Sequence, residues 1–371
     1  MDRPSDDSLP PSLPPSPDDW EARARETLTA HAYDYFAGGA GDEVTLRANR
    51  SAWTEMFLRP RVLVDVSEVD PSVELLGTRL PHPVVLAPTA FQRLAHPDGE
   101  IATARAAAAT GSLLVASSLS TVTIEEIGAA ATGPLWLQLY VFKDRGISAD
   151  LVQRGRAAGC RAVCRTVSVP VQGNRERDAR NGFKLPEGLD MANFRGLVQE
   201  RMPDRRGTEP TSGLDRLVSE QFDASLTWDA VDWLRGIAGM PVVLKGIMTR
   251  EDARLAVQHG VSAVVVSNHG GRQLEGAWPT SRALRDVVEG VEGKIPVRVD
   301  GGIRRGGDVL REIALGATAV QIGRPYLWGL AAGGQRGVER VVELLVSDLK
   351  RAMALTGCPS LRDVDPGLLA G

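Results

Sequence analysis

Two side chains in the segment Ser267-Asn-His-Gly-Gly-Arg272 are suited to acid–base chemistry and to binding an anion. His269 carries one of five imidazoles in the chain, and Arg272 follows three residues later. An imidazole accepts a proton near neutral pH, and a nearby guanidinium can hold a carboxylate. The pair therefore predicts proton transfer on an acidic substrate. Taken alone, His269 is equally compatible with a turn histidine that is hydrogen-bonded to the backbone.

Two glycine-bearing loops later in the chain carry arginines. The first is Asp300-Gly-Gly-Ile-Arg-Arg-Gly306, and the second starts at Gly323-Arg324. Glycine leaves the backbone open to close approach by an anion, and a guanidinium suits two-point contact with phosphate oxygens. A single Gly-Gly pair would be weak evidence, whereas two such loops favour a phosphate site.

The elements that must position these residues form a regular pattern from residue 83 onward. Eight short apolar runs alternate with polar turns and helix-like segments that often end in glycine. Continuous apolar runs are typical of strands buried on both faces, and eight βα units favour an α/β fold of the (β/α)8 TIM-barrel type. The predicted strands are 83–87, 112–116, 135–139, 161–167, 241–245, 263–267, 296–300 and 319–323.

Functional groups of such a barrel stand at the carboxyl ends of its strands. In this chain these ends collect polar and small residues, whereas the strand interiors are apolar. One Ser or Thr there would most simply make a turn hydrogen bond, but the whole set indicates a composite site. The set is Ala87-Pro88-Thr89-Ala90, Ser117-Ser118, Gln138-Leu139-Tyr140, Thr166, Lys245-Gly246, Ser267 to Arg272, Asp300-Gly301-Gly302 and Gly323-Arg324.

The rest of the chain predicts one domain with two appended features. Residues 1–17 contain six prolines and few large apolar groups, so we expect a disordered tail. Residues 18–55 are predicted to form a helical cover, and the single barrel domain is predicted to span 18–371. The fourth and fifth predicted strands are separated by 168–240, whose charged middle, about 182–225, predicts a lid loop after strand four.

Composition excludes several classes of protein. The 371 residues carry 43 basic and 47 acidic side chains, and this near balance argues against a nucleic-acid binder. We find no run of about 18 apolar residues, as a membrane helix needs, and no apolar signal segment at the N-terminus. Three cysteines cannot form a disulfide framework and lack a second ligand pair, so no metal is expected. We expect a cytoplasmic protein.

Eight segments carry a family resemblance, namely YDYFAGGAGDEVTLRANR, RPRVLVDVS, LAPTAFQRLAHPDGE, QLYVFKD, LKGIMTREDARLAVQHG, VSNHGGRQLEG, VDGGIRRGGDVLREIALGA and IGRP. Over about residues 31–360 the chain resembles the FMN-dependent 2-hydroxy acid oxidases and dehydrogenases, such as glycolate, lactate and 4-hydroxymandelate oxidase. SNHGGRQL is highly diagnostic of this family. The resemblance implies an FMN cofactor, a 2-hydroxy acid substrate, O2 or another electron acceptor, and a homotetramer.

The resemblance also implies roles for individual residues. Arg272 and Arg175 would clamp the substrate carboxylate with help from Tyr35, Tyr140 would contact the hydroxyl side, and His269 would be the base. Lys245 would lie beside flavin N1 and the C2 carbonyl. Contacts to the flavin ring system are implied for Ala87, Thr89, Ser117, Gln138 and Thr166, and Pro88, Ala90 and Ser267 are implied to bind the cofactor as well. Contacts to the ribityl phosphate are implied for Asp300, Gly301, Gly302, Arg304, Gly323 and Arg324.

Two departures from the family pattern affect the expected chemistry. The fourth strand ends Thr166-Val167-Ser168, where the family has an aspartate that pairs with the base histidine. A carboxylate raises the basicity of imidazole, whereas serine brings no charge. Leu119 stands where glycolate oxidase has a pocket tryptophan, and Phe91 could pack against it, so a substrate larger than glycolate, aromatic or branched, is expected.

Three functions therefore stay open. The leading one is oxidation of a 2-hydroxy acid to the 2-oxo acid, with the flavin reoxidised by O2 to give H2O2. Ser168 favours a second, a diverged flavin-barrel reaction such as oxidative decarboxylation. The third is an FMN-binding protein with little turnover, which is disfavoured because His269, Arg272, Arg175 and Tyr35 are all present.

Overall fold

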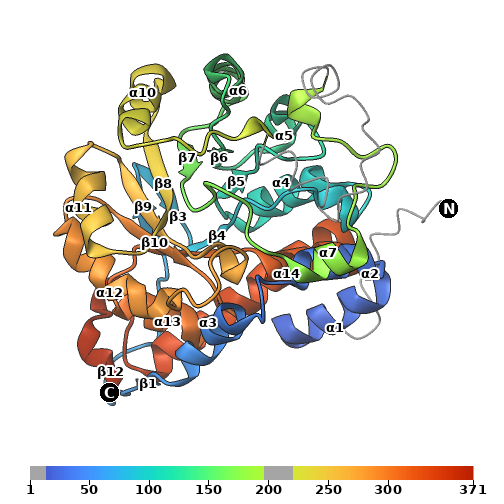
Figure 1. Cartoon of the computed structure of the whole chain (residues 1–371). Coiled ribbons are helices and arrows are strands. Elements are labelled where there is room, and N and C mark those ends of the chain that lie inside the picture. Colours follow the sequence, from blue (N-terminus) through green and yellow to red (C-terminus); the bar gives the residue numbers. More distant parts are fainter. Residues whose placement is uncertain (1–13, 196–219, 371) are drawn as a thin grey trace.

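Eight parallel strands close into a barrel in the computed structural model, which describes residues 14–195 and 220–370 (Figure 1). Each strand pairs with its neighbours in chain order, and the last pairs with the first. The strands are β4 (Val84–Leu86), β5 (Leu114–Ala116), β6 (Leu135–Leu139), β7 (Val163–Thr166), β8 (Val242–Ile247), β9 (Ala263–Val266), β10 (Val297–Asp300) and β11 (Ala319–Ile322). The predicted TIM barrel and its eight strands are confirmed.

The barrel strands are apolar because both of their faces are buried. Alternate residues point inward, where Val85, Val115, Trp136, Val243 and Val265 pack in the lumen. The residues between them face the surrounding helices. The antiparallel hairpin of β2 (Val73–Leu75) and β3 (Thr78–Leu80) adds Leu75 and Leu80 to the inner cluster.

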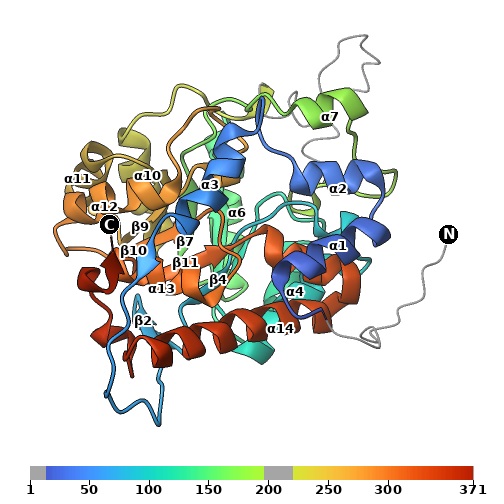
Figure 2. The same cartoon turned by 90° about the horizontal axis from the view of Figure 1, so that it is seen from below.

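Helices surround the barrel, as Figure 1 shows. The long helix α14 is interrupted at Gly333 and Gly334, and it runs alongside α1 and α4 (Figure 2). The helices after the first strand are α4 (Gly99–Thr110), α5 (Ile124–Ala130), α6 (Arg145–Ala157), α7 (Glu176–Asn181), α10 (Asp229–Ala238), α11 (Arg250–Gln258), α12 (Thr280–Val291), α13 (Gly306–Ala314) and α14 (Arg324–Leu355). Short 3-10 turns are η1 (Gln92–Leu94), η2 (Ala192–Phe194), η3 (His269–Gly271), η4 (Leu361–Asp363) and η5 (Pro366–Leu368).

Three helices precede the barrel and form the predicted cover: α1 (Pro17–Thr27), α2 (Ala30–Ala37) and α3 (Val44–Thr54). Helix α1 is capped by Ser16, so the helix begins one residue before the predicted domain boundary at residue 18. The predicted disordered tail otherwise falls mainly on residues 1–13, outside the described residues. Asn49 on α3 exchanges amide hydrogen bonds of 2.9 and 2.8 Å with Asn268, which fixes the cover to the end of β9.

Outside the barrel, β1 (Phe57–Leu58) forms a small antiparallel pair with β12 (Leu369–Ala370). None of the helices in the described ranges, α14 included, combines the length and apolar composition needed to cross a membrane.

The predicted lid, about 182–225, falls largely on residues 196–219, which lie outside the described residues. The lid therefore stays a prediction.

We expect that replacing Arg298 on β10 with an apolar residue stabilises the folded protein. Arg298 is fully buried inside the barrel, with its Cζ 4.4 Å from the ring centroid of Trp136. Its guanidinium forms no ion pair among the described residues, and its nearest polar neighbour is the Cys164 thiol. Burying such a charge is costly. We expect Arg298→Met to raise the free energy of unfolding by about 1–3 kcal/mol, measured by urea denaturation. Arg161→Met, at an exposed position, should change little, and a destabilised Arg298→Met would show that the contact with Trp136 outweighs desolvation.

Candidate active site

A pocket opens at the carboxyl ends of the barrel strands and brings most of the predicted site residues together. Its wall combines residues at or beyond the carboxyl end of every barrel strand with residues of the helical cover. The predicted residues that line it are Tyr35, Ala87, Pro88, Thr89, Ala90, Leu119, Tyr140, Arg175, Lys245, His269, Arg272, Asp300, Gly301, Gly302, Arg304, Gly323 and Arg324.

Four predicted cofactor residues lie behind this wall rather than in it, namely Ser117, Gln138, Thr166 and Ser267. The Gln138 side chain donates to Thr166 Oγ1 at 3.0 Å and accepts from the Ser118 N–H at 3.1 Å. It thereby ties together the ends of β5, β6 and β7. These residues hold the pocket wall in place.

Phe91 does not line the pocket, contrary to the prediction. It is 1% exposed, and its ring centroid lies 5.8 Å from that of Tyr35. Its left-handed backbone, with φ of 59°, starts the η1 turn and directs the ring into the core. Phe91 therefore supports Tyr35 from behind, and the sequence could not show this because the turn geometry decides it.

The tight η3 turn after β9 presents His269 to the pocket. His269, Gly270 and Gly271 all have positive φ angles, of 59°, 65° and 73°. Such a conformation is unfavourable for histidine and suits glycine. At Gly271 a Cβ atom would lie 2.6 Å from the backbone nitrogen of Leu46, so glycine also lets α3 pack against the turn.

His269 is held as a neutral imidazole. Its Nδ1 lies 3.2 Å from Ser168 Oγ, so Nε2 is the nitrogen left for proton transfer. Burial lowers the pKa of His269 well below 6.5, and the positive charges of Lys245, Arg175 and Arg272 lower it further. A neutral imidazole at neutral pH can accept a proton.

Two arginines and two tyrosines form the side of the pocket suited to a carboxylate. Arg272 donates to the carbonyls of Tyr35 and Gly38, at 2.6 and 2.8 Å, and its guanidinium lies 5.1 Å from the Tyr35 ring centroid. Arg175 donates to the carbonyl of Arg272 at 3.5 Å. Burial, followed by repulsion from Arg272, lowers the pKa of Arg175 to about 10, so the Arg175 guanidinium stays charged at neutral pH. Tyr140 closes this side.

Lys245 belongs to a buried network at the floor of the pocket. Its Nζ donates to Ser267 Oγ at 2.8 Å and forms an ion pair of 2.8 Å with Asp300. Ser267 in turn donates to Asp300 at 2.7 Å. The network fixes the ammonium group in the pocket, where it can stabilise negative charge on a bound group.

The two glycine-bearing loops form the other end of the pocket. Arg324 donates to the carbonyls of Phe36, Gly270 and Gly38. The Nε of Arg304 is buried without a hydrogen bond among the described residues, and it lies 3.5 Å from the Asp18 carboxylate in an ion pair. Burial and repulsion from other arginines lower the pKa of Arg324 to about 9. Both arginines therefore offer positive charge to a ligand.

The charges that line the pocket favour two bound anionic groups. Among its described lining residues five are cationic, namely Arg175, Lys245, Arg272, Arg304 and Arg324, and one, Asp300, is a carboxylate. Since Asp300 already neutralises Lys245, the four arginines remain. Arg175 and Arg272 lie on the carboxylate side. Arg304 and Arg324 lie at the end formed by the two glycine-bearing loops, here called the phosphate end.

The comparisons with known proteins identify the family. Residues 24–371 match the family described as FMN-dependent dehydrogenase. The chain belongs to this family. The predicted resemblance, the FMN cofactor and the assignment as an FMN-dependent oxidoreductase are thereby confirmed. The two glycine-bearing loops with Arg304 and Arg324 suit the phosphate of FMN, and Lys245 suits its ring system.

The chain is similar along most of its length to curated and solved family members. It is 48% identical to an L-lactate oxidase of Nostoc sp. (strain PCC 7120 / SAG 25.82 / UTEX 2576), over 95% of this chain and 96% of that protein. It is 44% identical to a glycolate oxidase of Spinacia oleracea, over 95% and 94% of the two chains. A mandelate oxidase solved with (S)-4-hydroxymandelic acid superposes with a TM-score of 0.90 at 45% identity, over 96% of this chain and 98% of that one.

Several pocket residues were not predicted from the sequence. Val169, Gln172 and Phe222 come from the long segment after β7, and Gln321 comes from β11. The Gln172 amide oxygen, turned toward Arg175, accepts from its Nη1 at 3.0 Å. Only Gln321, a polar residue within an apolar strand, had a signal in the sequence that could have indicated its place.

Proposed function

We propose that this enzyme oxidises a 2-hydroxy acid larger than glycolate to the 2-oxo acid, and that O2 reoxidises the flavin to give H2O2. The observation that carries the proposal is the single pocket in which neutral His269 stands beside Arg272 and Arg175, next to a phosphate-type end. The relatives named lactate oxidase and glycolate oxidase, and the solved mandelate oxidase, support the same reaction class.

Each residue of the pocket has a defined task in this reaction. Arg272 and Arg175 bind the substrate carboxylate, Tyr35 and Tyr140 orient the molecule, and His269 Nε2 accepts the proton that the substrate loses. When bound, FMN accepts the two electrons. Lys245 and the arginines at the phosphate end would hold FMN.

The walls of the pocket support a substrate with an apolar or aromatic side chain. Ala90, Leu119, Val169 and Phe222 line it, and the Phe222 ring stacks on Tyr140 with 4.7 Å between centroids. An aromatic side chain could pack against these groups. Mandelate-type acids are therefore the substrates we expect first, as in the solved mandelate oxidase with (S)-4-hydroxymandelic acid.

A panel of (S)- and (R)-2-hydroxy acids, followed by flavin bleaching without O2 and by H2O2 release with O2, tests the proposal. We expect (S)-mandelate to reduce the flavin faster than glycolate. Flavin reduction without H2O2 release would mean that an electron acceptor other than O2 reoxidises the flavin. No reduction by any acid of the panel would contradict the proposed function.

A diverged reaction is the second candidate, because the hydrogen-bond partner of His269 Nδ1 is the uncharged Ser168. A diverged enzyme such as an oxidative decarboxylase would release CO2 and a shortened acid. Quantifying CO2 and the 2-oxo acid after one turnover distinguishes the two reactions. FMN binding without any turnover would support the third candidate, a flavin-binding protein.

We expect that a substitution at the phosphate end weakens the binding of FMN but not the binding of riboflavin. Arg304→Gln removes a buried charge that lines the pocket and whose ion pair within the described chain, with Asp18, is 3.5 Å long. One charge-assisted hydrogen bond to phosphate corresponds to about a tenfold change in the dissociation constant. We expect that loss for FMN, measured by fluorescence quenching on the apoprotein, and no change for riboflavin, which lacks the phosphate. Equal weakening of both ligands would contradict this role.

The proposal also covers the oligomeric state and the cellular location of the enzyme. We propose a homotetramer in the cytoplasm, as the resemblance and the composition imply. Sedimentation velocity of the holoenzyme tests the oligomeric state, and a monomer would contradict it.

A further inference from the structure

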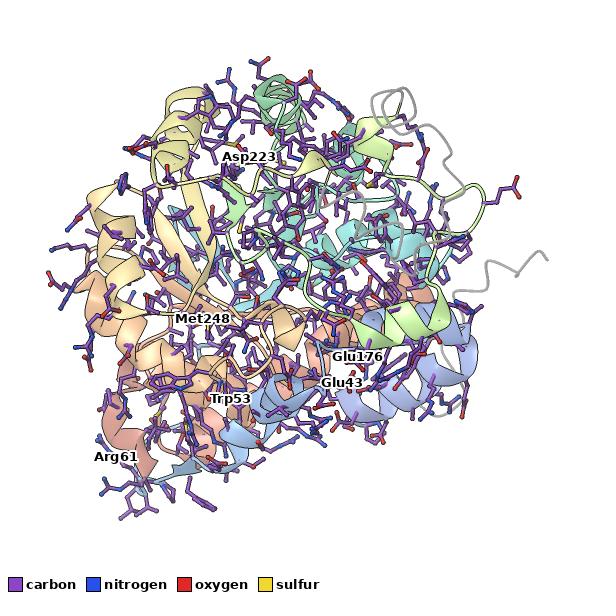
Figure 3. All side chains as sticks on the ribbon, viewed as in Figure 1. Glu43, Trp53, Arg61, Glu176, Asp223 and Met248 are labelled. Carbon is purple, nitrogen blue, oxygen red and sulfur yellow. The ribbon has the colours of Figure 1, made fainter. Side chains whose placement is uncertain are left out.

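A second cavity lies beside the active site, on the far side of the Tyr140–Phe222 stack. Residues of β7 and β8, the residues that follow β7 and the segment that leads into α10 line it. Tyr140, Val169 and Phe222 line both cavities, so they form the wall between them. Figure 3 labels Asp223 on the segment that covers this cavity.

Arg165 on β7 lines this cavity and is nearly fully buried. Its side chain is 4% exposed, and its Nε and Nη1 have no hydrogen-bond partner among the described residues. Burial, then the charge of Arg145, lowers the pKa of Arg165 to about 10, whereas Asp223 raises it. The guanidinium is therefore charged at neutral pH.

Neither carboxylate of the cavity forms an ion pair with Arg165 within the described ranges, although Asp223 is near enough to raise its pKa. Asp223 forms an ion pair of 3.1 Å with Arg145 and accepts from Ser225. Asp252 lies at the start of α11, and the described residues show no ion pair between it and Arg165. A buried guanidinium without a counter-ion costs several kcal/mol, and a cavity beside it gives an anion room to bind.

The rest of the cavity wall is apolar. Leu226, Trp228, Val231 and Leu244 line it, so a ligand with a hydrocarbon or aromatic body would bury apolar surface there. Arg298, the comparable buried arginine, lines none of the cavities described for this chain. Arg165 differs because space for a ligand adjoins it.

We propose that this cavity binds a small organic anion, a carboxylate with an apolar body, as a molecule separate from the substrate. The carboxylate would bind to Arg165 and the apolar body would pack against Trp228 and Leu244. Its other face would contact the Tyr140–Phe222 wall, so occupancy would be transmitted to the substrate pocket. The proposal goes beyond the oxidation of the hydroxy acid and does not depend on it.

Calorimetric titration of the holoenzyme with benzoate tests the site. Benzoate should occupy two sites, one at the catalytic arginines and one at Arg165. Arg165→Leu and Arg272→Leu should each bind one benzoate, and the double variant none. Arg161→Leu, an exposed position on the same segment, is the matched control and should bind two. Benzyl alcohol, the uncharged analogue, should bind to the Arg165 site at least tenfold more weakly.

Three outcomes would overturn the proposal. The first is unchanged stoichiometry in Arg165→Leu, and the second is loss of all binding in either single variant, which would mean one ligand spanning both cavities. If Arg165→Leu fails to fold, a crystal of the native holoenzyme soaked with 4-bromobenzoate tests the site, because the anomalous signal of bromine locates the ligand. The third contradicting outcome is the absence of a bromine signal between Arg165 and Trp228. These readouts measure binding only, so they are independent of whether the hydroxy acid is oxidised.

Discussion

His269→Gln is expected to lower the rate of flavin reduction by the substrate about 10²–10⁴-fold, the usual contribution of a positioned general base. Glutamine keeps a polar group of similar size but cannot accept the proton at neutral pH. The variant should still bind FMN, because the phosphate end is formed by other residues, including Arg304 and Arg324. Stopped-flow absorbance without O2 measures the rate directly.

The native pH profile gives an independent check on the same residue. Because burial and the surrounding cations lower the pKa of His269 well below 6.5, the imidazole stays neutral through neutral pH. The rate should therefore stay level as the pH falls toward 6 and drop only when more acid protonates the base. His259→Gln is the matched control, since His259 pairs with Asp232 away from the pocket. If the flavin is still reduced quickly in His269→Gln, a group other than His269 accepts the proton from the substrate.

The barrel was predictable because its signal is local and repeated. Runs such as 263–267 are short, apolar and followed by polar residues, which is enough to define a strand and its functional end. The same rule placed His269, Lys245 and Asp300 in one pocket, since the ends of parallel strands meet at one edge.

Residues outside this rule could not be placed from the sequence. Phe222 reaches the pocket from the long segment between β7 and α10, which has little periodicity and whose path is set by contacts such as the Phe222–Tyr140 stack. Arg272 is positioned by carbonyls of Tyr35 and Gly38, more than 230 residues earlier in the chain. Such long-range contacts leave no pattern in the local sequence.

Arg165 shows a different limit of sequence analysis. The run 161–167 predicts a strand correctly, and the arginine inside it has no special spacing. Whether a buried guanidinium meets a carboxylate, a packed wall or a cavity depends on neighbours from other elements. Here those neighbours are Tyr140, Phe222 and Trp228, which only the fold brings together.

Ser168→Asp is the second substitution with a large expected effect. Ser168 Oγ lies 3.2 Å from His269 Nδ1, so an aspartate there would place a carboxylate beside the imidazole. Opposite charge favours the protonated form, so we expect the pKa of His269 to rise. A stronger base also stabilises the transition state in which the proton is transferred, so flavin reduction should become about tenfold faster.

The sign of the pH effect separates this explanation from a simple change in packing. A raised pKa means that the base is protonated, and activity lost, at a higher pH than in the native enzyme, so the acid limb of the profile must move upward. Ser168→Asn, which matches aspartate in shape but has no charge, should leave that limb in place. If native reduction is already fast and Ser168→Asp neither accelerates it nor moves the limb, the serine hydroxyl suffices to orient His269. The charge usual in the family would then not be what makes this imidazole a base.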